Sequence, residues 1–498
     1  MRAELPACLV ALALLVGACE TTRPVAPPAD PSRPWSPPEA LRREVEATLA
    51  QLDRDQAPGL AAPVLDPAHA YSRAELIDLA QRRNPATRAA WEEARQAGEA
   101  AGVARSTLLP RLAASVVGGY QRLSTEVPLP LGGSLDTTTE VQGVVPLLTV
   151  EWLLFDFGER AALLDASRHL ATAANVRFTQ AHRQLVFDVS RAFNALAAAG
   201  LKEAASGRAV AAAGRLLAAA EAREGRGVGT RIEVAQARQQ AAQAELSLVQ
   251  ARGESAAARV ALNATLDAPP GTPIRIRDSA GHLPPAAAED LDRVIAKALA
   301  RRPDIMAGVA QIQAAQAGER AAAAGLRPKV GLIGALGLWD NQFRINNSDT
   351  LGTPIQQTGI LLGVTMPLFD GGLRSGNLGS ARSRVLAAQA AVATARDAAA
   401  TEIAAAYEAL GTGLASYRAA DALVAAATLT AEAADKGLAL GIGTLTDAAA
   451  AEKALLDAEN ARTDARRAAF DAAATLAFAT AALPAEDGPD GQGPVRKP

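Results

Sequence analysis

The chain has 498 residues, a formal net charge of −3 and an aromatic content of only 3 %, and alanine is its dominant residue. The nearly balanced charge argues against a nucleic-acid partner, which would need a strongly basic surface. Both cysteines, Cys8 and Cys19, fall close to the N-terminus, so the remaining chain has no disulfide framework. Abundant alanine favours helices that pack closely together.

The N-terminus has the pattern of a targeting signal. The apolar run from Leu9 to Val16 is too short to span a membrane and is typical of a cleaved signal peptide. Val16-Gly17-Ala18-Cys19 resembles a bacterial lipobox, which predicts that Cys19 is the acylated first residue of the mature protein. An ordinary secretory signal with an incidental cysteine is the alternative. The proline-rich stretch that follows is typical of an extended tether.

Helical patterns come next along the chain. A short helix is predicted from Glu39 to Asp55. A longer one is predicted from Ser72, which has capping-box spacing to Glu75, to about Leu108, because Pro110 then ends it.

Two pairs of strands interrupt the helical pattern. Apolar and polar residues alternate in Leu148–Leu154 and around Val116–Tyr120, and the second half repeats this pair at 330–339 and 360–369. Each strand is expected to have about ten residues, a length that suits a tilted membrane strand. The polar segments at about 123–143 and 340–358 are predicted to be loops.

A very long helix should follow each pair of strands. No proline occurs between Pro146 and Pro269, or between Pro367 and Pro484. A helix from about Gly158 to Glu224 would be ~100 Å long. Its apolar residues have coiled-coil spacing, as do those of the second helix: Val186, Val189, Phe193 and Leu196, then Ile403, Tyr407, Leu410, Leu414 and Tyr417. A glycine-rich turn and a shorter returning helix follow.

The two halves of the chain repeat one another. Pro85 and Pro303 lie 218 positions apart (303 − 85), as do Pro110 and Pro328 (328 − 110). Two later pairs lie 214 apart, Asp156 with Asp370 (370 − 156) and Gly229 with Gly443 (443 − 229). The pattern predicts two structural repeats, each with a helix, two strands, a very long helix, a turn and a returning helix.

Four strands cannot close a membrane barrel, and open edges in lipid would leave backbone groups unpaired. Three copies sharing one barrel would supply twelve strands. The apolar residues of two strands should then face lipid, whereas Thr149 and Glu151 should face the lumen: Leu148, Val150, Trp152 and Leu154, with Ile360, Leu362, Val364 and Met366. Aromatic residues near the strand segments suit an interfacial girdle: Tyr120, Trp152, Phe155, Phe157, Trp339, Phe343 and Phe369. Two amphipathic hairpins on a soluble core are the alternative.

These residues together resemble the TolC-type outer-membrane efflux proteins, in their lipoprotein subset, over about residues 72 to 483. The resemblance rests on helix starts, helix-to-strand turns and strand-to-helix junctions that occur twice in one order: Asn84-Pro85 and Arg302-Pro303, Pro110 and Pro328, "LFDFG" and "PLFDGG", and the glycine turns. It implies a mostly α protein forming a homotrimer. A twelve-stranded transmembrane β-barrel would lie in the outer membrane of a Gram-negative bacterium and continue as a long α-helical barrel in the periplasm. There it would meet a periplasmic adaptor and an inner-membrane transporter.

The resemblance also implies a gate at the periplasmic end, lined by two aspartates three residues apart on the second returning helix. Aligning Gly441 with the family's turn glycine places Asp447 and Ala450 there, so this chain retains one acid, and Glu233 is its counterpart in the first half. A carboxylate that only stabilises the start of its helix is the alternative. The turns are predicted to dock the adaptor rather than merely reverse the chain, through Gly227, Gly229, Thr230, Gly441, Gly443 and Thr444.

The predicted organisation is a lipoprotein signal peptide, a lipid-anchored tether, a first repeat, a linker, a second repeat and a flexible tail, at 1–18, 19–70, 71–270, 271–289, 290–483 and 484–498. No catalytic, cofactor or metal site is predicted, because the four histidines are scattered and have no acid or cysteine at ligand spacing. The resemblance, together with this lack of a catalytic pattern, implies a passive exit duct of a tripartite efflux or secretion system. A periplasmic coiled-coil adaptor or scaffold is the alternative.

Overall fold

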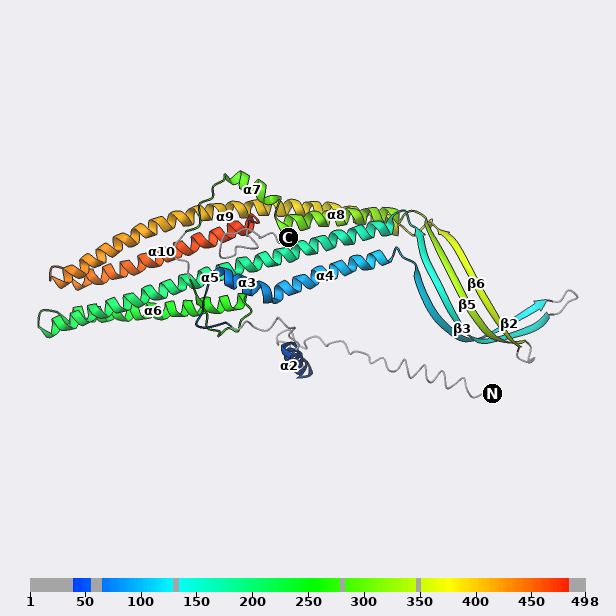
Figure 1. Cartoon of the computed structure of the whole chain (residues 1–498), viewed down its shortest axis with the longest axis horizontal. Helices are drawn as coiled ribbons and strands as arrows, with labels where there is room; N and C mark the ends of the chain where they lie inside the picture. The colour runs from blue at the N-terminus through cyan, green and yellow to red at the C-terminus, as the bar shows by residue number, and fades with distance from the viewer. Residues whose placement is uncertain (1–38, 55–64, 129–133, 278–282, 346–350, 483–498) are drawn as a thin grey trace, which may run out of the picture. The chain divides into compact units, whose positions relative to one another are not determined.

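The computed structural model describes residues 39–54, 65–128, 134–277, 283–345 and 351–482 (Figure 1). The predicted signal peptide, Cys19 and the tail 484–498 lie outside these residues. The chain divides into two compact units, Met1–Ala61 and Ala62–Pro498. Its described residues form the helix α2 (Glu39–Arg54), within a residue of the predicted bounds.

The second unit contains the remaining elements, in which pairs of helices alternate with one or two strands. Its helices are α3 (Arg73–Arg83), α4 (Pro85–Ser106), α5 (Glu159–Gly225), α6 (Arg231–Thr265), α7 (Leu291–Leu299), α8 (Pro303–Ala324), α9 (Leu373–Ala439) and α10 (Leu445–Ala479). Its strands are β1 (Ala70–Tyr71), β2 (Arg111–Pro128), β3 (Ser134–Phe155), β4 (Arg275–Ile276), β5 (Lys329–Ile345) and β6 (Leu351–Thr365).

The helix predicted from Ser72 to Leu108 is in fact two helices. The capping box of Ser72 and Glu75 is present at the start of α3. The chain then breaks at Asn84, whose backbone is extended (φ −71°, ψ 125°) and whose side-chain oxygen accepts from the N–H groups of Ala86 and Thr87. The break follows from Pro85, which disfavours a helical residue before it but suits the first position of a new helix.

The four long strands form one antiparallel sheet in the order β2-β3-β5-β6. They have 15 to 22 residues, so they are longer than the ten predicted. The prediction of loops at 123–143 and 340–358 was therefore wrong over most of both segments. Polar side chains there pair across strands, as in Ser124 with Thr138 (3.4 Å between hydroxyl oxygens) and Arg122 with Glu140 (3.8 Å). At the other end β6 stops at Thr365, before Met366 and Pro367.

The register gathers apolar residues on one face of this sheet. One row across all four strands is Leu112, Val150, Gly334 and Ile360, and the next contains Trp152, Leu332 and Leu362. Residues directly opposite in antiparallel strands share a face, so the predicted set on β3 and β6 lies together. Leu154 departs from it, because a bulge between Leu153 and Phe155 places Phe155 opposite Val330.

The long helices pack through the predicted heptad residues. Val189 and Ile403 are completely buried, and Phe193 and Leu410 are nearly so. The helix α5 packs against α4, α6, α8 and α10, whereas α9 packs against α8 and α10. The small side chains of alanine let these helices approach closely. Corresponding helices have equal lengths: 22 residues in α4 and α8, 67 in α5 and α9, and 35 in α6 and α10.

A carboxylate–guanidinium clamp holds each strand-to-helix junction. Asp156 accepts from the N–H groups of Gly158 (3.1 Å) and Arg160 (3.0 Å) at the start of the long helix. The Arg160 guanidinium donates to Asp156 (2.7 Å) and to the carbonyl of Thr107 at the end of α4 (2.7 Å). Asp370 and Arg374 make the corresponding contacts at the start of α9. The clamp therefore ties the end of one helix to the start of the next.

Between Asp156 and α5, the backbone at Phe157 is left-handed, with φ of 53°. The position 214 residues later (371 − 157) is Gly371, with φ of 64°. Glycine adopts this conformation without penalty, whereas a bulky residue there costs on the order of 1–3 kcal/mol.

We predict that Asp156→Ala destabilises the protein by about 3–5 kcal/mol, because it leaves the largely buried Arg160 without its charged partner. Burial alone would raise the pKa of Asp156, but the hydrogen bonds and charge of Arg160 hold it below the ordinary value. The contribution should therefore be present above the ordinary aspartate pKa of about 3.9 and lost as pH falls through the lower folded-state pKa. Thermal unfolding in detergent at several pH values measures both effects.

Asp370→Ala is the matched control, since its clamp makes the corresponding contacts but its carboxylate and guanidinium are more exposed (23 % and 21 %, against 8 % and 12 %). A smaller loss of thermal stability is expected there. Equal losses would contradict the role assigned to burial.

Candidate functional site

Two turns of the same geometry join the long helices to the returning helices. In the first, the Gly227 N–H donates to the Glu224 carbonyl (2.8 Å), and the N–H groups of Val228 and Gly229 donate to that of Arg223 (both 3.0 Å). In the second, Gly441, Ile442 and Gly443 make the same set of bonds to the carbonyls of Leu438 and Gly437. The six predicted docking residues all lie in these turns or cap the helices that follow.

Glycine is required in these turns for two reasons. Gly227 and Gly441 are left-handed, each with φ of 75°. A Cβ at Gly229 would lie 2.8 Å from the backbone nitrogen of Glu224, and one at Gly443 would lie 3.0 Å from backbone atoms of residues 437 and 438. Larger residues at these positions would therefore distort the turn itself.

The turns carry exposed apolar side chains above a buried cluster. Val228, Ile232, Leu440 and Ile442 are 66–84 % exposed. Beneath them, residues of all four helices pack together, so both turns lie at the same end of the helices, as Figure 1 shows: Leu216, Ala220, Val234, Ala237, Leu445 and Ala448, with Leu438. Exposed apolar groups concentrated at one place are typical of a contact surface.

The two candidate gate acids both interact with the start of their own helix. Glu233 accepts from the Thr230 N–H (2.9 Å), and its own N–H donates to the Thr230 hydroxyl (3.2 Å), which completes a capping box. The Asp447 N–H donates to the Thr444 hydroxyl (3.1 Å), which in turn donates to the Asp447 carboxylate (2.6 Å). This geometry is the one expected of capping carboxylates. The spacing of Thr230 to Glu233 could have predicted it from the sequence.

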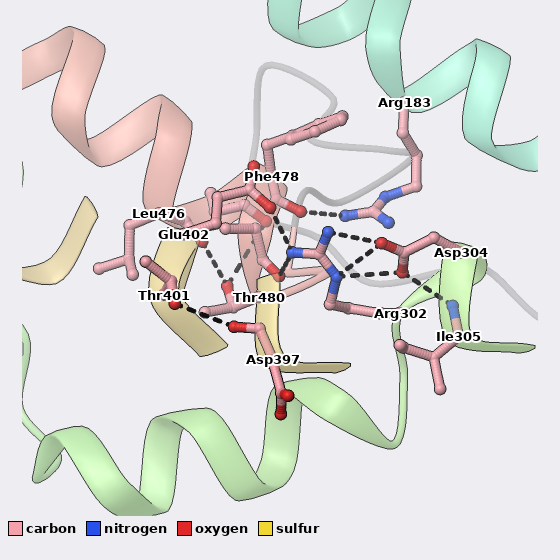
Figure 2. Close-up of polar contacts among 12 residues, drawn as sticks. Arg183, Arg302, Asp304, Ile305, Asp397, Thr401, Glu402, Leu476, Phe478 and Thr480 are labelled. Carbon is pink, nitrogen blue, oxygen red and sulfur yellow. Dashed lines mark hydrogen bonds and ion pairs between the residues drawn. The ribbon is translucent and has the colours of Figure 1, made fainter. Parts of the chain in front are cut away.

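A second polar site lies where the returning helix α10 ends (Figure 2). Arg302 precedes Pro303 at the start of α8, and its side chain is only 11 % exposed. Its guanidinium donates to Glu402 of α9 (2.7 Å), to Asp304 (2.7 Å) and to the carbonyl of Ala479, the last residue of α10 (3.1 Å). One side chain therefore joins three helices.

Burial disfavours the charged form of Arg302, but the two carboxylates that bind it have the larger, opposite effect. Desolvation lowers the pKa of Arg302, whereas hydrogen bonds and charges from Asp304 and Glu402 raise it above the ordinary value. Nearby, burial and the charge of Arg302 lower the pKa of Arg183, which donates to the Phe478 carbonyl (2.7 Å). Two cations thus lie at the C-terminal, carbonyl end of α10, where they interact favourably with the helix dipole.

The first half of the chain uses an amide at the corresponding place. Asn84 lies 218 positions before Arg302 (302 − 84), and its amide nitrogen is 3.5 Å from the carbonyl of Thr265, the last residue of α6. Thr265 and Ala479 correspond at the offset of 214 (479 − 265). The sequence identified Asn84 and Arg302 as helix starts but did not predict that they anchor the returning helices.

The described residues include no group of three histidine, cysteine, aspartate or glutamate side chains that could hold a metal ion. His69 pairs with Glu75 (3.3 Å), whereas His182 lines a mostly apolar hollow of about 360 Å³ with Arg183 and Met306. Burial lowers the pKa of His182. Within the same part of the chain, every helix is too short or too polar to cross a membrane.

The family model described as outer membrane efflux protein matches residues 76–267 and 294–482, most of the chain. The chain belongs to this family. The TolC-type resemblance of the sequence is therefore confirmed.

Individual relatives of this outer membrane efflux protein agree with the match. Protein CyaE of Bordetella pertussis is 29 % identical over 382 residues, which cover 76 % of this chain and 77 % of that protein. Outer membrane protein OprJ of Pseudomonas aeruginosa is 27 % identical over 391 residues, with coverages of 76 % and 75 %. The solved structure of the Campylobacter jejuni CmeC outer membrane channel has a TM-score of 0.68 at 19 % identity, with coverages of 82 % and 85 %. This last likeness concerns the fold.

Proposed function

We propose that the chain is the exit duct of a tripartite efflux or secretion system, a passive conduit from the periplasm across the outer membrane. An inner-membrane transporter would drive it through a periplasmic adaptor. The observation that carries this function is the family match over both halves of the chain, which includes the sheet and the 67-residue helices. At 1.5 Å per residue, such a helix is ~100 Å long and could cross a wide aqueous space.

The alternative of an adaptor or scaffold protein fits less well. An adaptor would have one helical hairpin flanked by β-rich domains. This chain instead has two hairpins, α5–α6 and α9–α10, that lie in corresponding places after two pairs of long strands. Their equal lengths also support the proposal that each chain contains two structural repeats.

The open edges of the sheet support a trimer. Within the described residues β2 and β6 each pair on one side only, and backbone groups left unpaired in lipid cost several kcal/mol each. Three copies joined edge to edge would close a barrel of twelve strands (3 × 4). The apolar face of the sheet would then contact lipid, and the helices would form the periplasmic tube.

The internal repeat predicts how α9 of one copy would pack on α4 of the next. Ala173 of α5 and Ala307 of α8 are buried in one cluster. In the other half of the chain, the position that corresponds to Ala173 is Ala387 of α9 (173 + 214). The position that corresponds to Ala307 is Ala89 of α4 (307 − 218), and both alanines are exposed. A neighbouring copy would bury this second pair as α8 buries the first.

We therefore predict that a double Ala89→Cys, Ala387→Cys variant forms covalent dimers and trimers on treatment with a short thiol crosslinker, read on a denaturing gel. The control pair Ala173→Cys, Ala307→Cys should crosslink within one chain and retain monomer mobility. Monomers alone from the first variant, with the control crosslinked, would contradict this packing.

The exposed tips support docking of an adaptor. We predict that Val228→Asp with Ile442→Asp lowers export at least about tenfold, because a charge removes an apolar contact. Stability should change by no more than about 0.5 kcal/mol, since both side chains are exposed. Export assays with trimer quantification measure this.

Val228→Ile with Ile442→Val is the matched control and should preserve export. These variants test docking more directly than changes at Gly229 or Gly443, because larger residues at those two positions would distort the turn. Normal export by the aspartate variant would leave the turns with the single role of reversing the chain.

Asp447, with Glu233, is proposed to line the closed end of the tube, where three chains would place a ring of carboxylates. We predict that Asp447→Ala lowers cation selectivity in single-channel recordings. Thr444→Ala is the control, because it removes the capping hydroxyl but keeps the charge. If both variants lose only a little thermal stability and keep the wild-type current, Asp447 is a capping residue and not a gate.

The signal at 16–19 supports a lipid anchor on Cys19, which would add ~0.8 kcal/mol of membrane affinity per buried CH₂. The family match supports location in the outer membrane. We predict that mass spectrometry finds Cys19 as the acylated N-terminal residue. An intact mature protein with an unmodified Cys19 thiol would contradict it.

A further inference from the structure

Phe157 occupies a backbone position that disfavours it. Its φ of 53° is left-handed, and the corresponding position in the second half is Gly371. The surrounding turn is the same in both halves, since Asp156 and Asp370 make the same clamp. Strained residues persist where the side chain has a function that the surroundings support. The aromatic ring of Phe157 therefore needs a role that the glycine at position 371 does not have.

The ring does not contribute to a core. Phe157 is 41 % exposed, and its contact is with Phe155, which is 52 % exposed. The ring centroids lie 4.7 Å apart in an edge-to-face arrangement. The guanidinium carbon of Arg327 lies 5.4 Å from the centroid of Phe157, within the range of a cation–π contact. Two exposed aromatic rings and one cation thus form a single surface group.

This group lies at the middle of the sheet's helix-facing end. Phe155 ends β3, Arg327 lies two residues before β5, and β3 and β5 are the two inner strands. A second copy that joins at β2 or β6 would leave the inner strands uncovered. The bulge also places Phe155 opposite Val330, on the apolar face of the sheet. The group is therefore continuous with the surface that would face lipid.

Arg327 differs from the other cations around it. Arg160 and Arg374 are engaged by Asp156 and Asp370, and Lys329 lies 2.6 Å from Glu159. Among the ion pairs of the described residues, none involves Arg327. Its guanidinium is held over an aromatic ring and is available to an anion at the edge of an apolar surface.

We propose that Phe155, Phe157 and Arg327 form a phospholipid-binding site at the membrane interface, in which the rings lie among the headgroups and the guanidinium binds the lipid phosphate. Aromatic rings favour this region of a bilayer, and arginine binds phosphate through paired hydrogen bonds. Glycine at 371 cannot supply a ring, so the site belongs to the first half only. The orientation of the site rests on the proposed function.

Depth-dependent quenching tests the site. A fluorescent thiol label on Phe157→Cys, in vesicles with nitroxide-bearing phospholipids, should be quenched at least about twofold more by a headgroup nitroxide than by one deep in the acyl chain. The label on Ile360→Cys, in the middle of the apolar face, should show the reverse. The unsubstituted protein, treated with the same label, gives the background.

The two labels separate the possible failures. If Ile360 is not quenched by the deep nitroxide, the sheet does not face lipid and the proposed function fails. If Ile360 behaves as expected while Phe157 is quenched by neither nitroxide, the proposed site alone is overturned.

Thermal unfolding tests the chemistry of binding without relying on the label. Phe157→Gly should leave the unfolding temperature in pure detergent unchanged or higher, because it removes the strain, yet added phosphatidylglycerol should stabilise it less than half as much as the wild type. Arg327→Gln should lose the same lipid-dependent shift. Arg382→Gln, which changes an exposed arginine paired with Glu319 on the helices, should keep it.

Three results would overturn the proposal. Lipid-dependent shifts equal to the wild type in both Phe157→Gly and Arg327→Gln would show that the site does not bind phospholipid. A lower unfolding temperature of Phe157→Gly in detergent would assign Phe157 to packing. An equal shift from inorganic phosphate would assign Arg327 to a free anion instead of a membrane lipid.

Discussion

In the part of the chain that the structure describes, β2 and β6 each have a partner strand on one side only, and the rest of the molecule depends on this constraint. A four-stranded sheet with one apolar face cannot be placed in lipid while its edges are open, because each unpaired group costs several kcal/mol. It also cannot be soluble without covering that face. Joining the edge strands of identical copies would pair these backbone groups and leave the apolar face to contact lipid. In the proposed trimer, three such sheets would close one barrel, and the helices that leave the sheet would follow the same symmetry.

The two halves of the chain solve the same structural problems with different residues. The returning helix is anchored by the Asn84 amide in the first half and by the buried Arg302 guanidinium in the second. The junction before the long helix uses Phe157 in one half and Gly371 in the other. Where corresponding positions have the same backbone conformation but different side chains, the larger side chain is a candidate for a function that only one half has. A comparison within one chain can therefore find candidate sites without a catalytic motif.

Much of this fold could be predicted from the sequence because its signals are local. Long proline-free segments and heptads predicted both long helices and located α5 within about a residue of its ends, and the capping box located the start of α3. The strands were underestimated because Thr, Gly and Gln in their outer parts have no apolar alternation. Hydrogen bonding between strands, such as Glu126 opposite Asp136, determines their length instead.

The site was less predictable than the fold. The anchors join residues far apart in the sequence, 181 positions for Asn84 with Thr265 and 177 for Arg302 with Ala479, so no local pattern reports them. The candidate gate acids were found only through the family resemblance, although their spacing to Thr230 and Thr444 is that of capping residues. The sequence thus identified where these residues lie but not which neighbours their side chains contact.

The contacts along α10 hold its C-terminal end more strongly than its N-terminal end. At its C-terminal end, Arg302 and Arg183 donate to the last carbonyls. Arg302 is also held by Asp304 and Glu402, and removing one partner of a buried ion pair costs about 3–5 kcal/mol. At its N-terminal end, the exposed Asp447 and Thr444 contribute only on the order of 0.3–1 kcal/mol to the start of the helix. Local openings begin where stabilising contacts are weakest. A displacement of the returning helix would therefore begin at the turn, with its C-terminal end beside the start of α8 as the fixed point, and the anchoring network would limit how far that displacement extends.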